Sequence, residues 1–250
     1  MYELRKWFLV SLAIIALAAS GCSQVINPIK GGAVLDWVDF IKLNGNSYRG
    51  LYSNVLKDPD DVTDQIVGEV QFKVADVVSN PKYKTKDGDA AFLAKGTKLY
   101  QVEGFRPEEV IAAEDESQIG GYRLYAGEEF FQTFGHHYKD VPKDRVEQIQ
   151  LYVQGEIRPF RILMDEEVSQ FISILENGED KSDFTPDRTN GDPIYYKMVF
   201  FTDGPLGYAY NLNDDGKNVF FSPWYTRVVD DEIRKFLEPA DLHLEWRNNE

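Results

Sequence analysis

Residues 193–223 read PIYYKMVFFTDGPLGYAYNLNDDGKNVFFSP, and this stretch decides the fold class of the chain. Aromatic and β-branched residues fill three short runs, which are separated by Gly-Pro and by Asn-Asp-Asp-Gly. Apolar runs that are bounded by turn residues are typical of strands joined by tight turns. The stretch therefore predicts three neighbouring strands of an antiparallel sheet.

Helical patterns flank these strands on both sides. Residues 165–177 predict a helix that Asp165 caps, with an apolar stripe made of Val168, Phe171, Ile172 and Leu175. Residues 230–238 predict a short second helix that Asp230 caps. With two more strands expected between residues 146 and 164, residues 145–250 predict an α+β domain with an antiparallel sheet and two helices.

The preceding hundred residues follow a different pattern. Between residues 35 and 134, short runs such as DWVDFIKL and QIVGEVQFKV alternate with turn signals, and almost no helical period is present. This part predicts a small, mostly β domain. The polar segment 135–144, GHHYKDVPKD, is interpreted as the linker between the two domains, so the chain predicts a mixed β and α+β fold.

The N-terminus has the pattern of an export signal. Arg5 and Lys6 precede a twelve-residue, mostly apolar run, which is too short for a transmembrane helix. Cys22, the only cysteine, follows Ala19-Ser20-Gly21 in a stretch that resembles the bacterial lipobox. The resemblance implies cleavage after residue 21, lipidation of Cys22 and a tether over residues 22–34. The alternative is an ordinary secreted protein cleaved after Ala19 or Gly21.

The charge balance narrows the class of partner. The chain carries a formal charge of -15, and removal of residues 1–21, with two basic residues and one acidic residue, makes it -16. Such a chain repels phosphate backbones, so nucleic acid is not expected as a partner. Anionic membrane surfaces and wall polymers are expected to be repelled too, whereas cations, basic peptides and neutral sugars stay open as ligands.

Several segments resemble a known family. Lys86–Leu93, which reads KDGDAAFL, precedes Gly96–Tyr100, and both stretches, with residues 191–212, resemble lipoproteins of Gram-positive spore-forming bacteria. The resemblance covers most of the chain after residue 22. That family has no assigned activity, so the resemblance implies a membrane-anchored protein and transfers no catalytic residue.

Three sets of acidic side chains are weak candidates for a cation site. Asp87 and Asp89 lie two apart in a loop, and Asp241, His243 and Glu245 share one face of an expected strand. A solvated turn for the first set and a solvated strand face for the second need fewer coincidences and are favoured. Residues 211–222 begin like a calcium loop, but Ser222 stands where that loop needs a glutamate, which favours a hairpin turn.

Aromatic residues of the second domain form the remaining candidate site. Tyr208 and Tyr210 fall on one face of their strand, and with Asp203 and Trp224 they form a candidate strip for neutral sugars or peptides. The alternative is that these rings fill the core. One helical stripe covers one sheet face, so we expect Phe200 and Phe220 to be buried and Tyr208 or Tyr210 to be partly exposed.

No motif of an enzyme stands out from these patterns. The sequence contains no G-x-S-x-G, no Walker loop and no dinucleotide-binding glycine loop, so we expect no cofactor. The sequence therefore predicts a membrane-anchored, non-catalytic binding module with an unknown protein, peptide or glycan partner. The alternatives are a cell-envelope hydrolase with a carboxylate site and a cation-binding surface protein.

Overall fold

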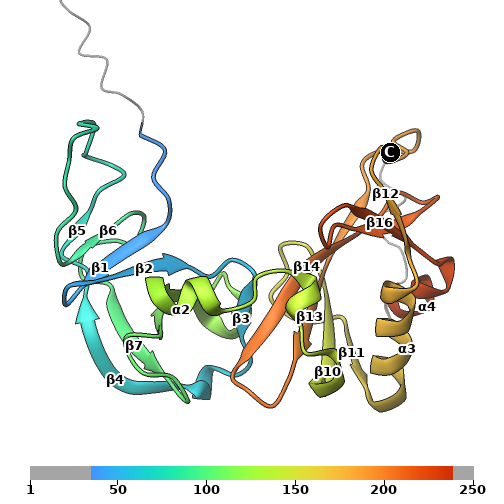
Figure 1. The fold of residues 1–250 in the computed structure, drawn as a ribbon, viewed down its shortest axis with the longest axis horizontal. Helices are drawn as coiled ribbons and strands as arrows, with labels where there is room; N and C mark the ends of the chain where they lie inside the picture. The colour runs from blue at the N-terminus through green and yellow to red at the C-terminus, as the bar shows by residue number, and fades with distance from the viewer. Residues whose placement is uncertain (1–34, 239–250) are drawn as a thin grey trace, which may run out of the picture. The chain divides into compact units, whose positions relative to one another are not determined.

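The computed structural model describes residues 35–238, and these form a mostly β structure with two eight-stranded sheets (Figure 1). Three α-helices occur in this part of the chain: α2 (Glu128–Thr133), α3 (Asp165–Glu176) and α4 (Arg234–Leu237). The mixed, β-rich character that the sequence predicts is confirmed. Helix α2 was not expected, because its six residues lie among short strands.

The first sheet has the strand order β4-β7-β8-β9-β2-β1-β6-β5. Its pairs are antiparallel except for β5 and β6, which are parallel. The strands are β1 (Phe40–Leu43), β2 (Asn46–Gly50), β4 (Val62–Glu69), β5 (Phe72–Lys73), β6 (Asp89–Ala90), β7 (Lys98–Val102), β8 (Val110–Glu114) and β9 (Tyr122–Gly127).

Strand β8 shows why both faces of this sheet are covered. Val110 and Ala112 point into a cluster with Leu124, whereas Ile111 and Ala113 point into a second cluster with Tyr125. All four β8 residues are buried, because successive side chains of a strand face opposite ways. An apolar run without alternation is therefore the mark of a strand buried on both sides.

The second sheet has the order β11-β10-β13-β14-β15-β16-β12, with β3 paired to β14, and its pairs are antiparallel. Asp215 and Gly216 form the turn between β14 and β15, which confirms the expected hairpin. The strands are β3 (Asn54–Leu56), β10 (Gln148–Val153), β11 (Arg161–Met164), β12 (Glu179–Lys181), β13 (Ile194–Phe201), β14 (Leu206–Asp214), β15 (Val219–Phe221) and β16 (Thr226–Val229).

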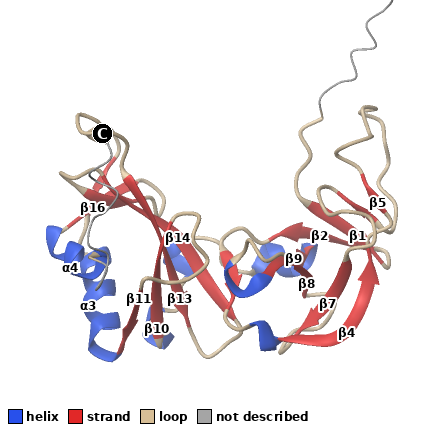
Figure 2. Cartoon of the chain, turned by 180° about the vertical axis from the view of Figure 1, so that it is seen from behind, coloured by secondary structure: helices blue, strands red, loops and turns tan. Residues whose placement is uncertain are grey.

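Helices α3 and α4 lie on one side of this sheet (Figure 2). The predicted stripe is confirmed, since Val168, Phe171 and Leu175 are buried in the largest apolar cluster. The predicted cap is wrong: Met164 occupies the N-cap position without a side-chain hydrogen bond, and Asp165 is the first helical residue, with φ 49°. Short polar residues tolerate this left-handed backbone better than most others.

The other face of the second sheet is covered by an earlier part of the chain. Phe200 of β13 points to the helices, whereas its neighbour Phe201 packs with Val55 of β3 and with Ile119. Strand β3 therefore supplies both an added strand and side chains for this face. The sequence pattern could not predict this cover, because 150 residues separate β3 from its partner β14.

Candidate functional site

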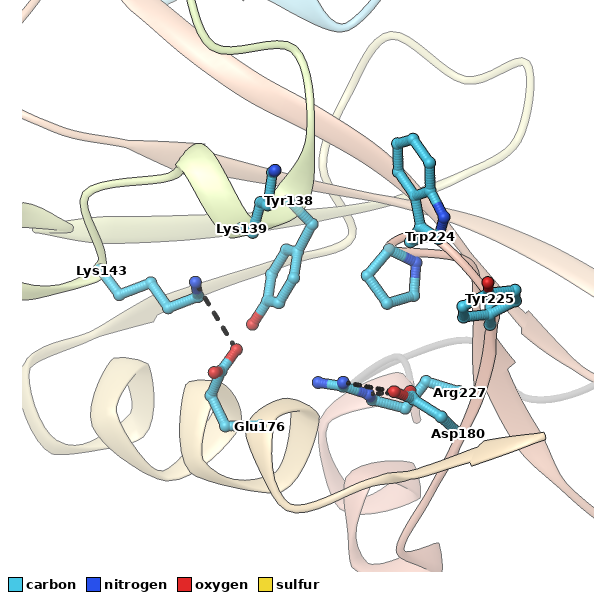
Figure 3. Close-up of a pocket in the computed structure, with 9 residues that line it drawn as sticks. Tyr138, Lys139, Lys143, Glu176, Asp180, Trp224, Tyr225 and Arg227 are labelled. Atoms are coloured by element: carbon cyan, nitrogen blue, oxygen red, sulfur yellow. Dashed lines mark hydrogen bonds and ion pairs between the residues drawn. The ribbon is translucent and has the colours of Figure 1, made fainter. Parts of the chain in front are cut away.

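A pocket of about 210 Å³ opens beside the loop that joins β15 to β16 (Figure 3). Its wall comes from that loop, and its floor comes from residues 138–143, the end of α3, β12 and β16. It is lined by Tyr138, Lys139, Lys143, Glu176, Asp180, Pro223, Trp224, Tyr225 and Arg227. Five separate segments thus bring aromatic rings and charged groups together.

Two exposed aromatic rings stand at the rim of the pocket. Trp224 is 69% exposed and Tyr225 is 60% exposed, although only Ser222 and Pro223 separate them from the buried strand β15. The ring of His137 meets the indole of Trp224 edge-on, with 5.1 Å between ring centroids. A tryptophan this exposed leaves a large apolar surface in contact with water, which is the usual property of a ring that a ligand can cover.

Tyr138 forms the floor of the pocket. It is 2% exposed, and its ring packs edge-on against Phe200, Tyr210 and Phe221, with the ammonium of Lys143 4.6 Å from the ring centroid. Its hydroxyl makes no hydrogen bond of ordinary geometry within the described residues. Burial raises the pKa of Tyr138, and the nearby carboxylate of Glu176 raises it further.

Two ion pairs complete the floor, as the dashed lines of Figure 3 show. Lys143 Nζ lies 3.6 Å from Glu176 Oε1, and Arg227 donates two hydrogen bonds, of 2.6 and 3.0 Å, to the carboxylate of Asp180. The bonds from Arg227 lower the pKa of Asp180. The floor therefore offers fixed donors and acceptors whose charges are largely compensated within the site.

The predicted aromatic strip does not form as one surface. Tyr208 stacks on Phe134 with 5.7 Å between centroids, Tyr210 packs edge-on against Tyr138, and neither lines the pocket. Both tyrosines are half-buried, and Phe200 and Phe220 are buried, as expected. Asp203 pairs with Arg145. Of the four predicted residues, only Trp224 lies in the pocket.

Sequence reasoning missed most of the residues that make this pocket. Tyr138 stands in the polar segment 135–144, where Tyr138 and Val141 are the only signals of packing among polar and charged residues. Glu176, Asp180 and Arg227 are separated along the chain, and only the pairing of β12 with β16 brings Asp180 beside Arg227. A local sequence pattern cannot predict the register of β12 against β16, because the two strands are far apart in the sequence.

The carboxylates of the Asp87 and Asp89 loop have separate partners. Asp87 accepts hydrogen bonds from the backbone N–H of Gly45 at 3.0 Å. Asp89 is buried and accepts from the hydroxyl of Tyr83 at 2.8 Å and from the N–H of Lys86 at 2.7 Å. Each carboxylate thus stabilises a turn, and the two are not arranged around a common point by these contacts.

Of the remaining acidic candidates, those near residue 215 lie within the described residues and those near residue 243 do not. Asp214 pairs with Arg234, and Asp215 accepts from the N–H groups of Asp187, Lys217 and Asn218. Within residues 35–238, no group of three or more histidine, cysteine, aspartate and glutamate side chains is placed to hold a metal ion. Asp241, His243, Glu245 and the lipidation candidate Cys22 lie outside the described residues.

Comparisons with known proteins add no relative: the chain matches no family model, no curated protein and no solved structure. Among the helices of residues 35–238, none is long and apolar enough to cross a bilayer.

Proposed function

We propose that this protein is a lipoprotein anchored through Cys22 to the outer face of the cytoplasmic membrane, where it acts as a non-catalytic binding module. In this proposal, a mostly β domain (residues 35–134) and an α+β domain (residues 145–250) follow the tether. The pocket between Tyr138 and Trp224 is the binding site, and neither a cofactor nor nucleic acid takes part. The exposed Trp224 above a polar floor is the observation that carries the proposal.

The chemistry of the pocket favours a ring-shaped, hydroxyl-bearing ligand. A sugar ring presents a face of C–H groups that suits the apolar face of Trp224, while its hydroxyls both donate and accept hydrogen bonds. The carboxylate of Glu176, paired with Lys143, and the guanidinium of Arg227, paired with Asp180, provide partners for such groups. A volume of about 210 Å³ is below the range of about 300–1,000 Å³ of sites for drug-sized ligands, so a single ring-sized unit fits best.

The carboxylates of the pocket support binding better than hydrolysis. A glycosidase needs one carboxylic acid that keeps its proton near neutral pH, and such an acid has a raised pKa. Arg227 instead lowers the pKa of Asp180. Burial raises the pKa of Asp39, but Asp39 does not line this pocket. A hydrolase therefore remains the alternative, to be tested by release of reducing ends from the oligosaccharides that bind.

Titration of the tryptophan fluorescence with neutral oligosaccharides tests the site. We expect a saturable change that Trp224→Ala abolishes, because the variant removes the surface on which a sugar ring stacks. Trp37→Phe is the matched control and should bind normally, since Trp37 does not line this pocket. Unaltered binding by Trp224→Ala would place the ligand elsewhere on the molecule.

Lipidation is tested separately at Cys22. Cells that express the protein are grown with a labelled fatty acid, and we expect label on the wild-type chain only. Cys22→Ser removes the thiol that accepts the lipid, so the variant should stay unlabelled and uncleaved at this position. Equal label on both proteins contradicts the anchor without affecting the sugar-binding proposal.

A further inference from the structure

One part of this acidic protein carries an excess of positive charge. Residues 71–98 contain three aspartates against six lysines, whereas the whole chain has a formal charge of -15. The segment has a net charge of +3, and the rest of the chain therefore carries -18. Net charge alone predicts repulsion from anionic surfaces, but a charge excess of this kind is local. The lysines are Lys73, Lys82, Lys84, Lys86, Lys95 and Lys98.

Internal contacts leave much of this positive charge available. Within the described residues, Lys84, Lys86 and Lys95 are exposed and form no ion pair, whereas Lys73 pairs with Asp76 at 3.0 Å. The other two aspartates of the segment, Asp87 and Asp89, are held by the turns described above. The ammonium groups of Lys84, Lys86 and Lys95 can therefore contact an external anion.

Exposed apolar side chains accompany these lysines. Val77 is 63% exposed and Val38 is 68% exposed, and Phe72 and Phe92 are also exposed. Isolated exposed apolar residues need no explanation, but several of them beside lysines form the pattern of a surface that contacts lipid. We call Val38, Phe72, Val77, Phe92 and the lysines Lys84, Lys86 and Lys95 the basic apolar surface.

Ring contacts and a backbone hydrogen bond bring these segments to one end of the first sheet. The ring of Tyr83 lies 6.5 Å from Trp37 and 6.5 Å from Phe72, and Ala75 donates a backbone hydrogen bond of 3.2 Å to Ala91. In Figures 1 and 2, β5 and the chain that leads into β1 lie at the same end of this sheet. Trp37, Phe72 and Tyr83 are therefore neighbours, and Val38, Lys84, Lys86 and Phe92 lie within a few residues along the chain from these contacts.

The position of this end along the chain points to its partner. Leu35 follows Cys22 by only thirteen residues, whose full extension is roughly 45 Å. If Cys22 carries the lipid, the basic apolar surface is the first folded part beyond the bilayer. A short tether keeps the local concentration of lipid high, so even a weak surface contact becomes populated.

We propose that the basic apolar surface lies directly against a bilayer that contains anionic lipids. This inference rests on the proposed lipid anchor. The lysines meet the lipid phosphates, and Val38, Val77 and the neighbouring aromatic rings enter the headgroup region, where Trp37 is close to the interface that tryptophan prefers. The rest of the anchored chain, which carries -19 after removal of residues 1–21, is repelled by the same membrane, so the two effects favour one orientation.

Fluorescence quenching by brominated lipids tests the orientation. The protein purified from membranes is reconstituted into vesicles of zwitterionic lipid alone or with about a third of anionic lipid, a mixture that gives the surface potential on which the attraction depends. We expect Trp37 to be quenched in the anionic vesicles, and Trp37→Phe to remove that quenching. Trp224→Phe, whose ring lies at the pocket beside the β15–β16 loop, should leave it unchanged.

Charge variants separate this contact from the effect of the anchor. The triple variant Lys84→Gln, Lys86→Gln, Lys95→Gln should reduce quenching in anionic vesicles to the zwitterionic level. The matched control, with Lys181, Lys197 and Lys217 changed to glutamine, should behave as wild type, and circular dichroism checks that both fold. Equal quenching of Trp37 in the two kinds of vesicle, or none in either, overturns the proposal.

The outcomes also distinguish this proposal from the one on which it rests. A chain that takes up labelled fatty acid but shows no quenching of Trp37 keeps its anchor and loses the surface contact. A chain without fatty acid is added to preformed vesicles instead, and its sedimentation with anionic but not zwitterionic vesicles still supports the basic apolar surface. Failure to sediment with either overturns it.

Discussion

At the scale of single residues, Asp39 is a buried carboxylate with an unusual set of neighbours. The hydroxyls of Tyr52 and Tyr125 both donate to it, at 3.2 Å, and Arg123 lies 3.7 Å away. Burial raises the pKa of Asp39 above its ordinary value of 3.8, although these partners partly offset the effect. Asp39 also lies beside Gly50, where a Cβ would be 2.9 Å from its carboxylate.

A raised pKa has a defined consequence for stability. As the pH rises above 3.8, the unfolded chain loses the Asp39 proton first, so the folded state binds more protons and its stability falls until the folded pKa is passed. Asp39→Asn cannot ionise. We expect the variant to be destabilised by about 1–3 kcal/mol at low pH, because one tyrosine loses its acceptor, and by less at neutral pH. Urea unfolding of both proteins from pH 3 to pH 7 measures the difference, and a destabilisation that grows with pH contradicts this account.

At the scale of elements, the carboxylates of Asp87 and Asp89 accept hydrogen bonds that hold the turns around the loop between β5 and β6. Asp89 is buried between Tyr83 and Lys86, and Asp87 reaches across to the turn between β1 and β2. Removal of a buried charged acceptor leaves two donors unpaired, whereas removal of an exposed acceptor leaves its donor to water. We therefore expect Asp89→Ala to cost about 1–3 kcal/mol and Asp87→Ala to cost less.

Calcium provides the test between a turn and a cation site. A site occupied at about a hundred times its Kd would raise the free energy of unfolding by about 2.7 kcal/mol. We expect calcium at about 10 mM, enough for a weak extracellular site, to leave the urea midpoint of the wild type unchanged. A calcium-dependent increase that Asp87→Ala and Asp89→Ala both remove would establish the cation-binding alternative.

The same elements show what a sequence can and cannot predict. The β14–β15 hairpin and the stripe of α3 follow from neighbouring residues, since turn chemistry and periodicity are local. The pairing of β3 with β14 and of β12 with β16 joins distant segments, so no window of sequence contains it. The pocket depends on such pairings, which explains why Trp224 was found and Tyr138 was not. Asp165 shows a different limit, because a residue type that suits a cap also suits a left-handed first turn.

At the scale of the whole molecule, segments of each half of the chain pair or pack with the sheet of the other half. In the sequence, β3 lies between β2 and β4, which belong to the first sheet. In the fold it pairs with β14, and next to this pair the Ala209 N–H donates to the Ser53 carbonyl at 2.8 Å. Leu206 of β14 in turn packs with Val102 and Val110 of the first sheet. A division of the chain at residues 135–144 therefore does not match the division of strands into sheets, because β3 belongs to the second sheet.

Limited proteolysis tests the division proposed at residues 135–144. Lys139 is exposed in this segment, so we expect trypsin to cut there first and to leave two fragments on a denaturing gel. Because β3 pairs with β14 and Tyr138 packs in the core of the second sheet, the cut chain should still elute as one species in native size-exclusion chromatography. Cleavage of a covalent link does not break the contacts that hold two packed fragments together.

A variant in β3 tests whether the pairing of β3 with β14 holds the two fragments together after cleavage. Leu56 is fully buried against residues of both sheets, and Leu56→Ala removes about 2–5 kcal/mol of packing. We expect the fragments of the cut variant to separate at a lower urea concentration than those of the cut wild type. Val77→Ala, at an exposed site away from β3, is the matched control and should not change the midpoint. Wild-type fragments that separate without urea would mean that β3 does not join the halves, and a chain that trypsin trims only from its ends would mean that residues 135–144 are not a boundary.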